Sequence, residues 1–135
     1  MTMLNTVSIL AARLIFAAVF AMAATFKFLG MDATAAMIAA AGFPMPLPLA
    51  WIAATFEVAL VIGLLTGHWF SLAAYLAAVY VLFLGFAFHG PSHWAGNQAE
   101  FGFFVDHFCF FAGLLFAAVH GPGDKWVWRL PRNVT

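Results

Sequence analysis

Residues 7–29 read VSILAARLIFAAVFAMAATFKFL, an almost unbroken apolar run that contains only two charged side chains, Arg13 and Lys27. At about 1.5 Å per residue, a helix of this length crosses the roughly 30 Å hydrocarbon core of a bilayer. A cleaved signal peptide is the competing interpretation, because Arg13 precedes an apolar stretch that ends in small residues at 21–24. The run continues to Leu29 beyond those small residues, which favours a transmembrane helix.

The composition of the whole chain places the protein in lipid. Hydrophobic residues make up 66% of the 135 residues, charged residues make up 7%, and the mean hydropathy is +1.02. A soluble domain of this size could not bury that much apolar surface. The net charge of zero leaves no basic surface for phosphates, which excludes nucleic acid as a partner. Cys109 is the only cysteine, so no intrachain disulfide or CxxC pair is possible, and redox chemistry would require a bound cofactor.

Three further apolar stretches follow, at residues 48–66, 69–88 and 101–120, each bounded by proline, glycine or polar residues. Between the first and second spans, residues 32–42 form an alanine-rich segment that is too short to cross a bilayer. This segment predicts an interfacial or re-entrant helix. The predicted fold is therefore all-α, with residues 1–135 forming a single membrane domain of four transmembrane helices and one short helix.

An even number of spans places both ends of the chain on one side of the membrane. The tail, residues 121–135, contains Lys125, Arg129 and Arg132, whereas the connections on the other side carry little positive charge. The positive-inside rule then predicts that both termini are cytoplasmic.

Five ionisable side chains within the spans are the candidate site residues: Arg13, Lys27, Glu57, Asp106 and His107. A charge near the bilayer centre costs roughly 2.5–3.5 kcal/mol, so these groups should face the bundle interior and find partners there. Counting about 1.5 Å per residue from the predicted helix ends orders them through the bilayer as Arg13, Glu57, then His107 with Asp106, then Lys27. We expect the Arg13 guanidinium to reach Glu57, and the two cations to balance the two carboxylates.

The interior charges allow a structural and a functional interpretation. Ion pairs between helices can serve only to fix the register and orientation of a bundle. Alternatively, Glu57 and His107 bind a quinone-like head group or relay protons, since histidine changes charge near neutral pH. In that interpretation Arg13, Lys27 and Asp106 form the surrounding charge network, and a quinone is the candidate cofactor.

A metal site is a further interpretation of the histidines. His89, His93 and His107, with a neighbouring carboxylate, could supply nitrogen and oxygen ligands. His89 and His93 have the i, i+4 spacing of a helical metal site, but Pro91 lies between them and disrupts the helical geometry. The sequence therefore predicts no metal site.

The order of these residues resembles the DoxX family of membrane proteins. The first span has Arg13, Phe20 and Lys27 in the arrangement R-x6-F-x6-K. Further motifs similar to those of the family follow in order along nearly the whole chain: Gly42-Phe43-Pro44, Phe56-Glu57, Gly63 to Gly67, Ala112 to Leu115 and Gly121-Pro122-Gly123. The fourth span departs from the pattern, because it has Asp106-His107 where many relatives have Lys-Asn.

The resemblance implies a four-helix protein of a bacterial inner membrane. Some DoxX relatives are associated with quinone-linked oxidation of sulfur compounds or with membrane redox complexes, which implies a redox-associated protein. The alternative is a non-enzymatic role, as a structural subunit of a membrane complex or a small-molecule carrier. For a subunit, an exposed small-residue face such as Gly63 and Gly67 would contact a partner. The candidate partners are the lipid bilayer, a membrane or peripheral redox protein, and a second copy of the chain.

Overall fold

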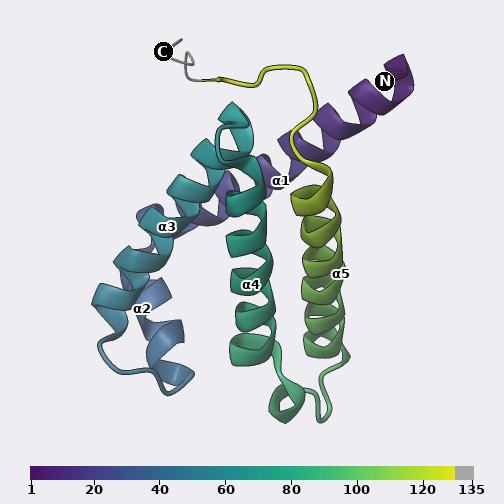
Figure 1. Cartoon of the computed structure of the whole chain (residues 1–135). Coiled ribbons are helices and arrows are strands. Elements are labelled where there is room, and N and C mark those ends of the chain that lie inside the picture. The colour runs from purple at the N-terminus through teal and green to yellow at the C-terminus, as the bar shows by residue number, and fades with distance from the viewer. Residues whose placement is uncertain (130–135) are drawn as a thin grey trace.

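The computed structural model describes residues 1–129, and the regular secondary structure of this part of the chain is helical throughout (Figure 1). Four helices, α1, α3, α4 and α5, are long and apolar enough to cross a membrane, and the short helix α2 lies between the first two of them. The predicted fold is confirmed, and the protein is a multi-pass membrane protein. The elements are α1 (Met3–Leu29), α2 (Met31–Ala40), α3 (Pro46–Thr66), α4 (Phe70–His89), the 3-10 turn η1 (Pro91–His93) and α5 (Gln98–His120).

The helix ends lie within four residues of the predicted span ends, and the largest differences are at the N-termini of α1 and α5. Helix α1 begins at Met3 because the Thr2 side chain accepts a hydrogen bond from the backbone of Asn5 at 3.2 Å. In α5 the Asn97 side chain accepts one from the backbone of Glu100. Such caps start a helix within polar residues, whereas the hydropathy pattern reports only its apolar part.

The bundle consists of two antiparallel helix pairs, α1 with α3 and α4 with α5, which meet along α3 and α4. Alanines dominate the buried face of α4, so the neighbouring helices approach it closely. Helix α2 packs against α3 at one end of the bundle. The shared core contains Ala17 and Phe20 of α1, Leu60 and Leu64 of α3, Ala74, Ala77 and Ala78 of α4, and Leu114 and Ala118 of α5.

Of the two glycines predicted to form an exposed partner face, Gly67 is buried and Gly63 is half-buried against α4. A Cβ atom added to Gly63 would lie 2.7 Å from the Cβ of Ala73, so this glycine permits close packing of α3 on α4. Gly67 is buried and adopts a φ of +68° in the tight turn that leads to α4, a conformation that glycine adopts without strain. The two glycines therefore do not form an exposed small-residue face, and a protein partner stays a prediction.

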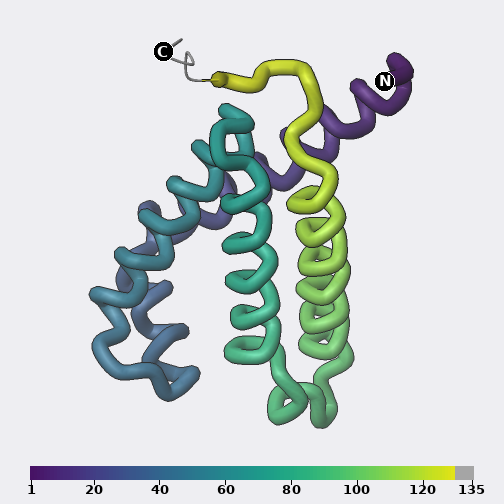
Figure 2. Tube along the Cα trace, viewed as in Figure 1, coloured from purple at the N-terminus to yellow at the C-terminus, as the bar shows by residue number. Residues whose placement is uncertain are grey.

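The N-terminal end of α1 and the segment that follows α5 lie at the same end of the bundle, and α2 and η1 lie at the opposite end (Figure 2). This arrangement agrees with four membrane crossings. Arg132, on which part of the charge argument depends, lies outside the described residues. The side of the membrane that the termini face stays a prediction.

Candidate functional site

Arg13 is buried in the bundle, with only 2% of its surface exposed, and its guanidinium is enclosed by backbone carbonyls. A guanidinium has five N–H donors, and each of them is used here. The carbonyl oxygens at the end of α3 have no partner within their helix and carry partial negative charge, so they suit a cation. Nε donates to Leu64 at 2.9 Å, Nη2 to Leu65 at 2.6 Å and Trp126 at 2.8 Å, and Nη1 to Pro122 at 2.9 Å and Lys125 at 2.8 Å.

The predicted contact between Arg13 and Glu57 is therefore wrong. Glu57 precedes Leu64 by seven residues, which is about 10 Å along the axis of α3. Arg13 finds closer acceptors at the end of that helix and in the segment that crosses the bundle after α5. Counting residues along a helix could not reveal these carbonyls.

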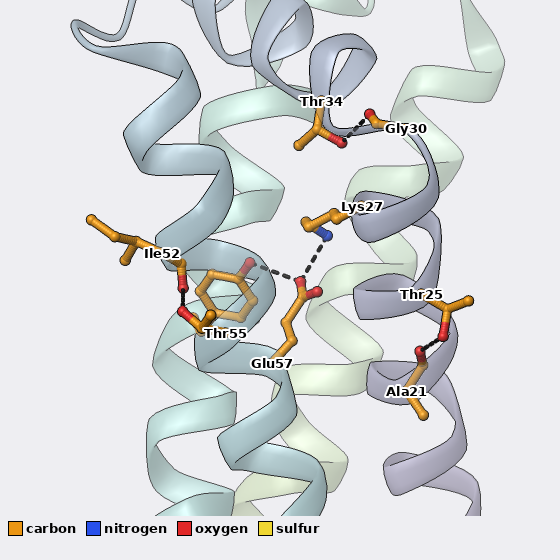
Figure 3. A network of polar contacts seen from close by, with 9 residues as sticks. Ala21, Thr25, Lys27, Gly30, Thr34, Ile52, Thr55 and Glu57 are labelled. Atoms are coloured by element: carbon orange, nitrogen blue, oxygen red, sulfur yellow. Dashed lines mark hydrogen bonds and ion pairs between the residues drawn. The ribbon is translucent and has the colours of Figure 1, made fainter.

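Lys27, rather than Arg13, is the cation that pairs with Glu57 (Figure 3). The Nζ atom of Lys27 lies 2.8 Å from Oε1 of Glu57, and the hydroxyl of Tyr80 donates to the same oxygen at 2.8 Å. The three side chains come from α1, α3 and α4, so one carboxylate links three of the four spans. Glu57 is 1% exposed, and within residues 1–129 its buried Oε2 atom has no hydrogen-bond partner.

Tyr80 is the residue of this cluster that sequence reasoning missed. A usable signal exists in the sequence, because Tyr80 places a polar hydroxyl within a long apolar span. A buried tyrosine hydroxyl usually finds a hydrogen-bond partner. Glu57, the predicted interior carboxylate, is the acceptor that it finds.

The adjacent residues Asp106 and His107 have different surroundings. The Nδ1 atom of His107 donates to the carbonyl oxygen of Phe103 at 2.7 Å, and its side chain packs against Gly85 of α4. Asp106 is exposed, and in the part of the chain that the structure describes it forms no ion pair or side-chain hydrogen bond. Successive residues point about 100° apart around a helix, so only one of the two faces α4. The expected place of Asp106 in the interior series is not observed.

A second polar pair joins the end of α4 to the beginning of α5. The Nδ1 atom of His89 lies 2.7 Å from Oε2 of Glu100, and both side chains are about one-quarter exposed, at 25% and 24%. His89 is the last residue of α4 and Glu100 lies in the first turn of α5, where the helix dipoles favour a positive and a negative group respectively. The rings of His89 and His107 are 5.1 Å apart. Within residues 1–129, no three histidine, cysteine or carboxylate side chains are arranged to hold a metal ion.

A cavity of about 750 Å³ is lined both by Lys27 and Tyr80, the partners of Glu57, and by the pair of His89 and Glu100. It lies between α2 and α3 on one side and α4 and α5 on the other, and its wall is mainly apolar, with Ile38, Ala53 and Phe83 among its residues. This volume falls in the range of roughly 300–1,000 Å³ that is typical of small-molecule sites. The polar residues of the wall are Lys27, Thr34, Tyr80, His89, His93, Glu100 and His107. Glu57 lies behind the wall and is connected to the cavity through Lys27 and Tyr80.

Gly85 allows His107 to occupy its place beside α4. A Cβ at Gly85 would lie 2.9 Å from the Cβ of His107, so Gly85→Ala must push α4 and α5 apart. We expect this substitution to lower the free energy of unfolding by about 1–3 kcal/mol, the usual cost of overpacking. The change can be measured by SDS titration in mild detergent, with helix content followed by circular dichroism.

Gly102→Ala, on α5, is the matched control for the substitution at Gly85. A Cβ at Gly102 would have no heavy atom within 4 Å. Because alanine favours a helix more than glycine, this variant should be as stable as the wild-type protein or more stable. Equal unfolding free energies for the two variants would show that Gly85 does not control the approach of α5.

The fold and the cavity define a small integral membrane protein whose four spans enclose a buried ion pair beside an apolar cavity. The DoxX family profile matches residues 8–90, more than half of the chain, and the protein belongs to the DoxX family. Neither a curated protein nor a solved structure matches the chain. The matched region contains Arg13, Lys27 and Glu57, and it ends before α5 begins.

Proposed function

We propose that this DoxX protein binds a small lipophilic molecule with a polar ring, a quinone or a close analogue, and serves membrane redox chemistry. The observation that carries the proposal is the cavity of about 750 Å³ with an apolar wall and a few polar groups. Small-molecule sites have this composition, since the apolar wall provides affinity and the polar groups fix the orientation of the ligand.

The Lys27 end of the cavity suits a ligand carbonyl. The ammonium group of Lys27 has three N–H donors, and one of them is used by Glu57. A second donor can bond to a ligand oxygen while the ion pair keeps the positive charge in place. The hydroxyl of Tyr80 gives its hydrogen to Glu57, so its oxygen remains available as an acceptor.

In this proposal Glu57 and His107 are the groups that exchange protons with the site. His107 lines the cavity directly, and Glu57 acts through Lys27 and Tyr80. Arg13 holds the bundle end, at a distance from the ligand. A bound quinone would supply the electron-transfer chemistry, for which the chain needs a cofactor because it contains a single cysteine.

The proposed location is a bacterial inner membrane, with both termini in the cytoplasm. The support for this orientation is the positive charge of Lys125 and Arg129 beyond α5, at the end of the bundle where the chain also begins. The cavity then lies toward the outer half of the membrane, because α2 and η1 are at the opposite end of the bundle.

Filling the cavity tests the proposal without changing a charge. Ala53→Phe adds a ring to the cavity wall, and we expect it to weaken binding of 2-decyl-1,4-benzoquinone to protein in nanodiscs by about tenfold or more, since the ligand and the ring compete for one space. Ala59→Phe, on an exposed part of α3, is the control and should leave binding unchanged. Mass spectrometry of lipophilic material retained by the wild-type protein would identify the natural ligand.

Equal quinone affinity in the two phenylalanine variants would contradict a ligand site in the cavity. Retention of a ligand that no electron donor can reduce would favour the carrier function instead. The carrier shares the cavity with the redox function, but it predicts release of the ligand in unchanged chemical form.

A further inference from the structure

The hydrogen bonds of His89 and His107 determine which nitrogen of each ring carries a hydrogen. A carbonyl oxygen only accepts, so the Nδ1 atom of His107, 2.7 Å from the carbonyl of Phe103, is the donor. An ionised carboxylate also only accepts, so the Nδ1 atom of His89 donates to Glu100 at 2.7 Å. In the neutral form of each ring, Nε2 is then an acceptor with a free lone pair.

The two histidines that carry these acceptor nitrogens, His89 and His107, lie side by side in the cavity wall. Both histidines line it, and their ring centroids are 5.1 Å apart. Within residues 1–129, neither Nε2 atom has a hydrogen-bond partner, although both Nδ1 atoms do. Gly85 holds the position of His107, and the Trp94 indole donates to the carbonyl of His89 at 2.8 Å and so fixes the end of α4.

We propose that His89 and His107 form a hydroxyl-binding site, so that the cavity selects a ligand with a hydrogen-bond donor at this end. The inference rests on the proposed function and makes the ligand class more specific. A hydroquinone or another phenol provides such a donor, whereas a quinone or an aryl ether provides only acceptors. At the other end, the ammonium of Lys27 is a donor that selects a ligand acceptor. The opposite hydrogen-bonding character of the two ends sets the orientation of the ligand.

Glu100 is a positioning residue in this site. It bonds to Nδ1 of His89, so it orients the ring and keeps Nε2 free to accept. A glutamine at this position retains an oxygen that can accept the same hydrogen, whereas alanine does not. Glu100→Ala should therefore weaken recognition of the hydroxyl, and Glu100→Gln should restore it.

The experiment compares two probes with the same ring and decyl chain, 2-decyl-1,4-hydroquinone and its dimethyl ether, in anaerobic binding titrations to protein in nanodiscs. The ether replaces both O–H donors by methoxy groups. We expect the wild-type protein to bind the hydroquinone about tenfold more tightly than the ether, the effect of one satisfied hydrogen bond. His89→Ala and His107→Ala should reduce this preference to less than about twofold with little change in ether affinity. His93→Ala is the control, because His93 also lines the cavity but is exposed and outside the pair, and it should keep the preference.

The outcomes separate this inference from the function on which it rests. If both probes bind with equal affinity and Ala53→Phe weakens both, the cavity binds ligand and the hydroxyl site is wrong. The hydroxyl site is also wrong if the preference survives both substitutions in the pair, or if only His93→Ala removes it. If neither probe binds the wild-type protein, or if Ala53→Phe has no effect on either, the proposed function fails together with the inference.

Discussion

Replacing Arg13 by methionine is expected to lower the free energy of unfolding by more than about 4 kcal/mol and to release the segment that follows α5. Five carbonyl oxygens lose a charged donor at once, and hydrogen bonds to charged groups are each worth about 1.5–3 kcal/mol, though not additively. Hydrogen–deuterium exchange provides the local measurement. The backbone N–H of Trp128 bonds to the carbonyl of Thr66 at 2.8 Å, and it should exchange faster once this segment leaves the bundle.

Two further variants show whether charge or geometry matters at this position. Arg13→Lys keeps the charge but has at most three donors, so its loss of stability should be intermediate. Lys125→Met removes a positive charge at the same end of the bundle but keeps all five hydrogen bonds, because only the backbone of Lys125 contacts Arg13. It should be as stable as the wild-type protein. A stable Arg13→Met variant with a protected Trp128 amide would refute the role of the guanidinium.

Replacing Lys27 by methionine is expected to lower the free energy of unfolding by about 3–5 kcal/mol, the usual effect of removing one partner of a buried ion pair. The Glu57 carboxylate is 1% exposed, and after the substitution the hydroxyl of Tyr80 is its only donor among residues 1–129. SDS unfolding followed by circular dichroism measures the change.

The double variant Lys27→Met with Glu57→Met should recover most of the lost stability. Replacing both members of a buried pair by apolar side chains is often neutral, because no unpaired charge is left in the interior. The double-mutant cycle then gives the coupling energy of Lys27 and Glu57. Additive effects of the two single substitutions would mean that the contact at 2.8 Å has no energetic importance.

The same double variant separates the structural and functional interpretations of the interior charges. If the pair only fixes the packing of α1 on α3, the stable double variant should bind 2-decyl-1,4-benzoquinone like the wild-type protein. If Lys27 orients the ligand, binding should weaken although the fold is intact. Lys27 is the member of the pair that lines the cavity, so the structure places it where a ligand could distinguish the two interpretations.

The positive charges of Arg13 and Lys27 are balanced by different groups, and this difference decides what each side chain can do. Arg13 donates to backbone carbonyls of α3 and of the segment that follows α5, so its guanidinium links these two parts at one end of the bundle. Lys27 faces one carboxylate and is 21% exposed beside a cavity. A lysine with unused donors at a cavity wall can serve a ligand, whereas an arginine with all five donors occupied cannot.

The number of spans, the presence of the short helix and the set of ionisable residues within the spans can be predicted from the amino-acid sequence alone. The bilayer fixes the length of an apolar helix, so a span is encoded in consecutive residues and can be counted directly. Because the number of spans is even, the beginning of α1 and the segment that follows α5 lie at the same end of the bundle. The predicted span ends differ from the helix ends by only a few residues, because caps such as Thr2 and Asn97 extend the helices into polar sequence.

The partners of the charged side chains, in contrast, depend on how the helices pack. The partners of Arg13 are backbone atoms between 51 and 113 residues away in the sequence, and the composition gives no sign of them. Depth along a helix increases linearly with residue number, so it placed Glu57 in the interior correctly. The direction of a side chain depends on how the helices are rotated and crossed. For this reason Asp106 is exposed, His107 packs against Gly85 of α4, and Tyr80 meets Glu57 only after α3 and α4 have packed.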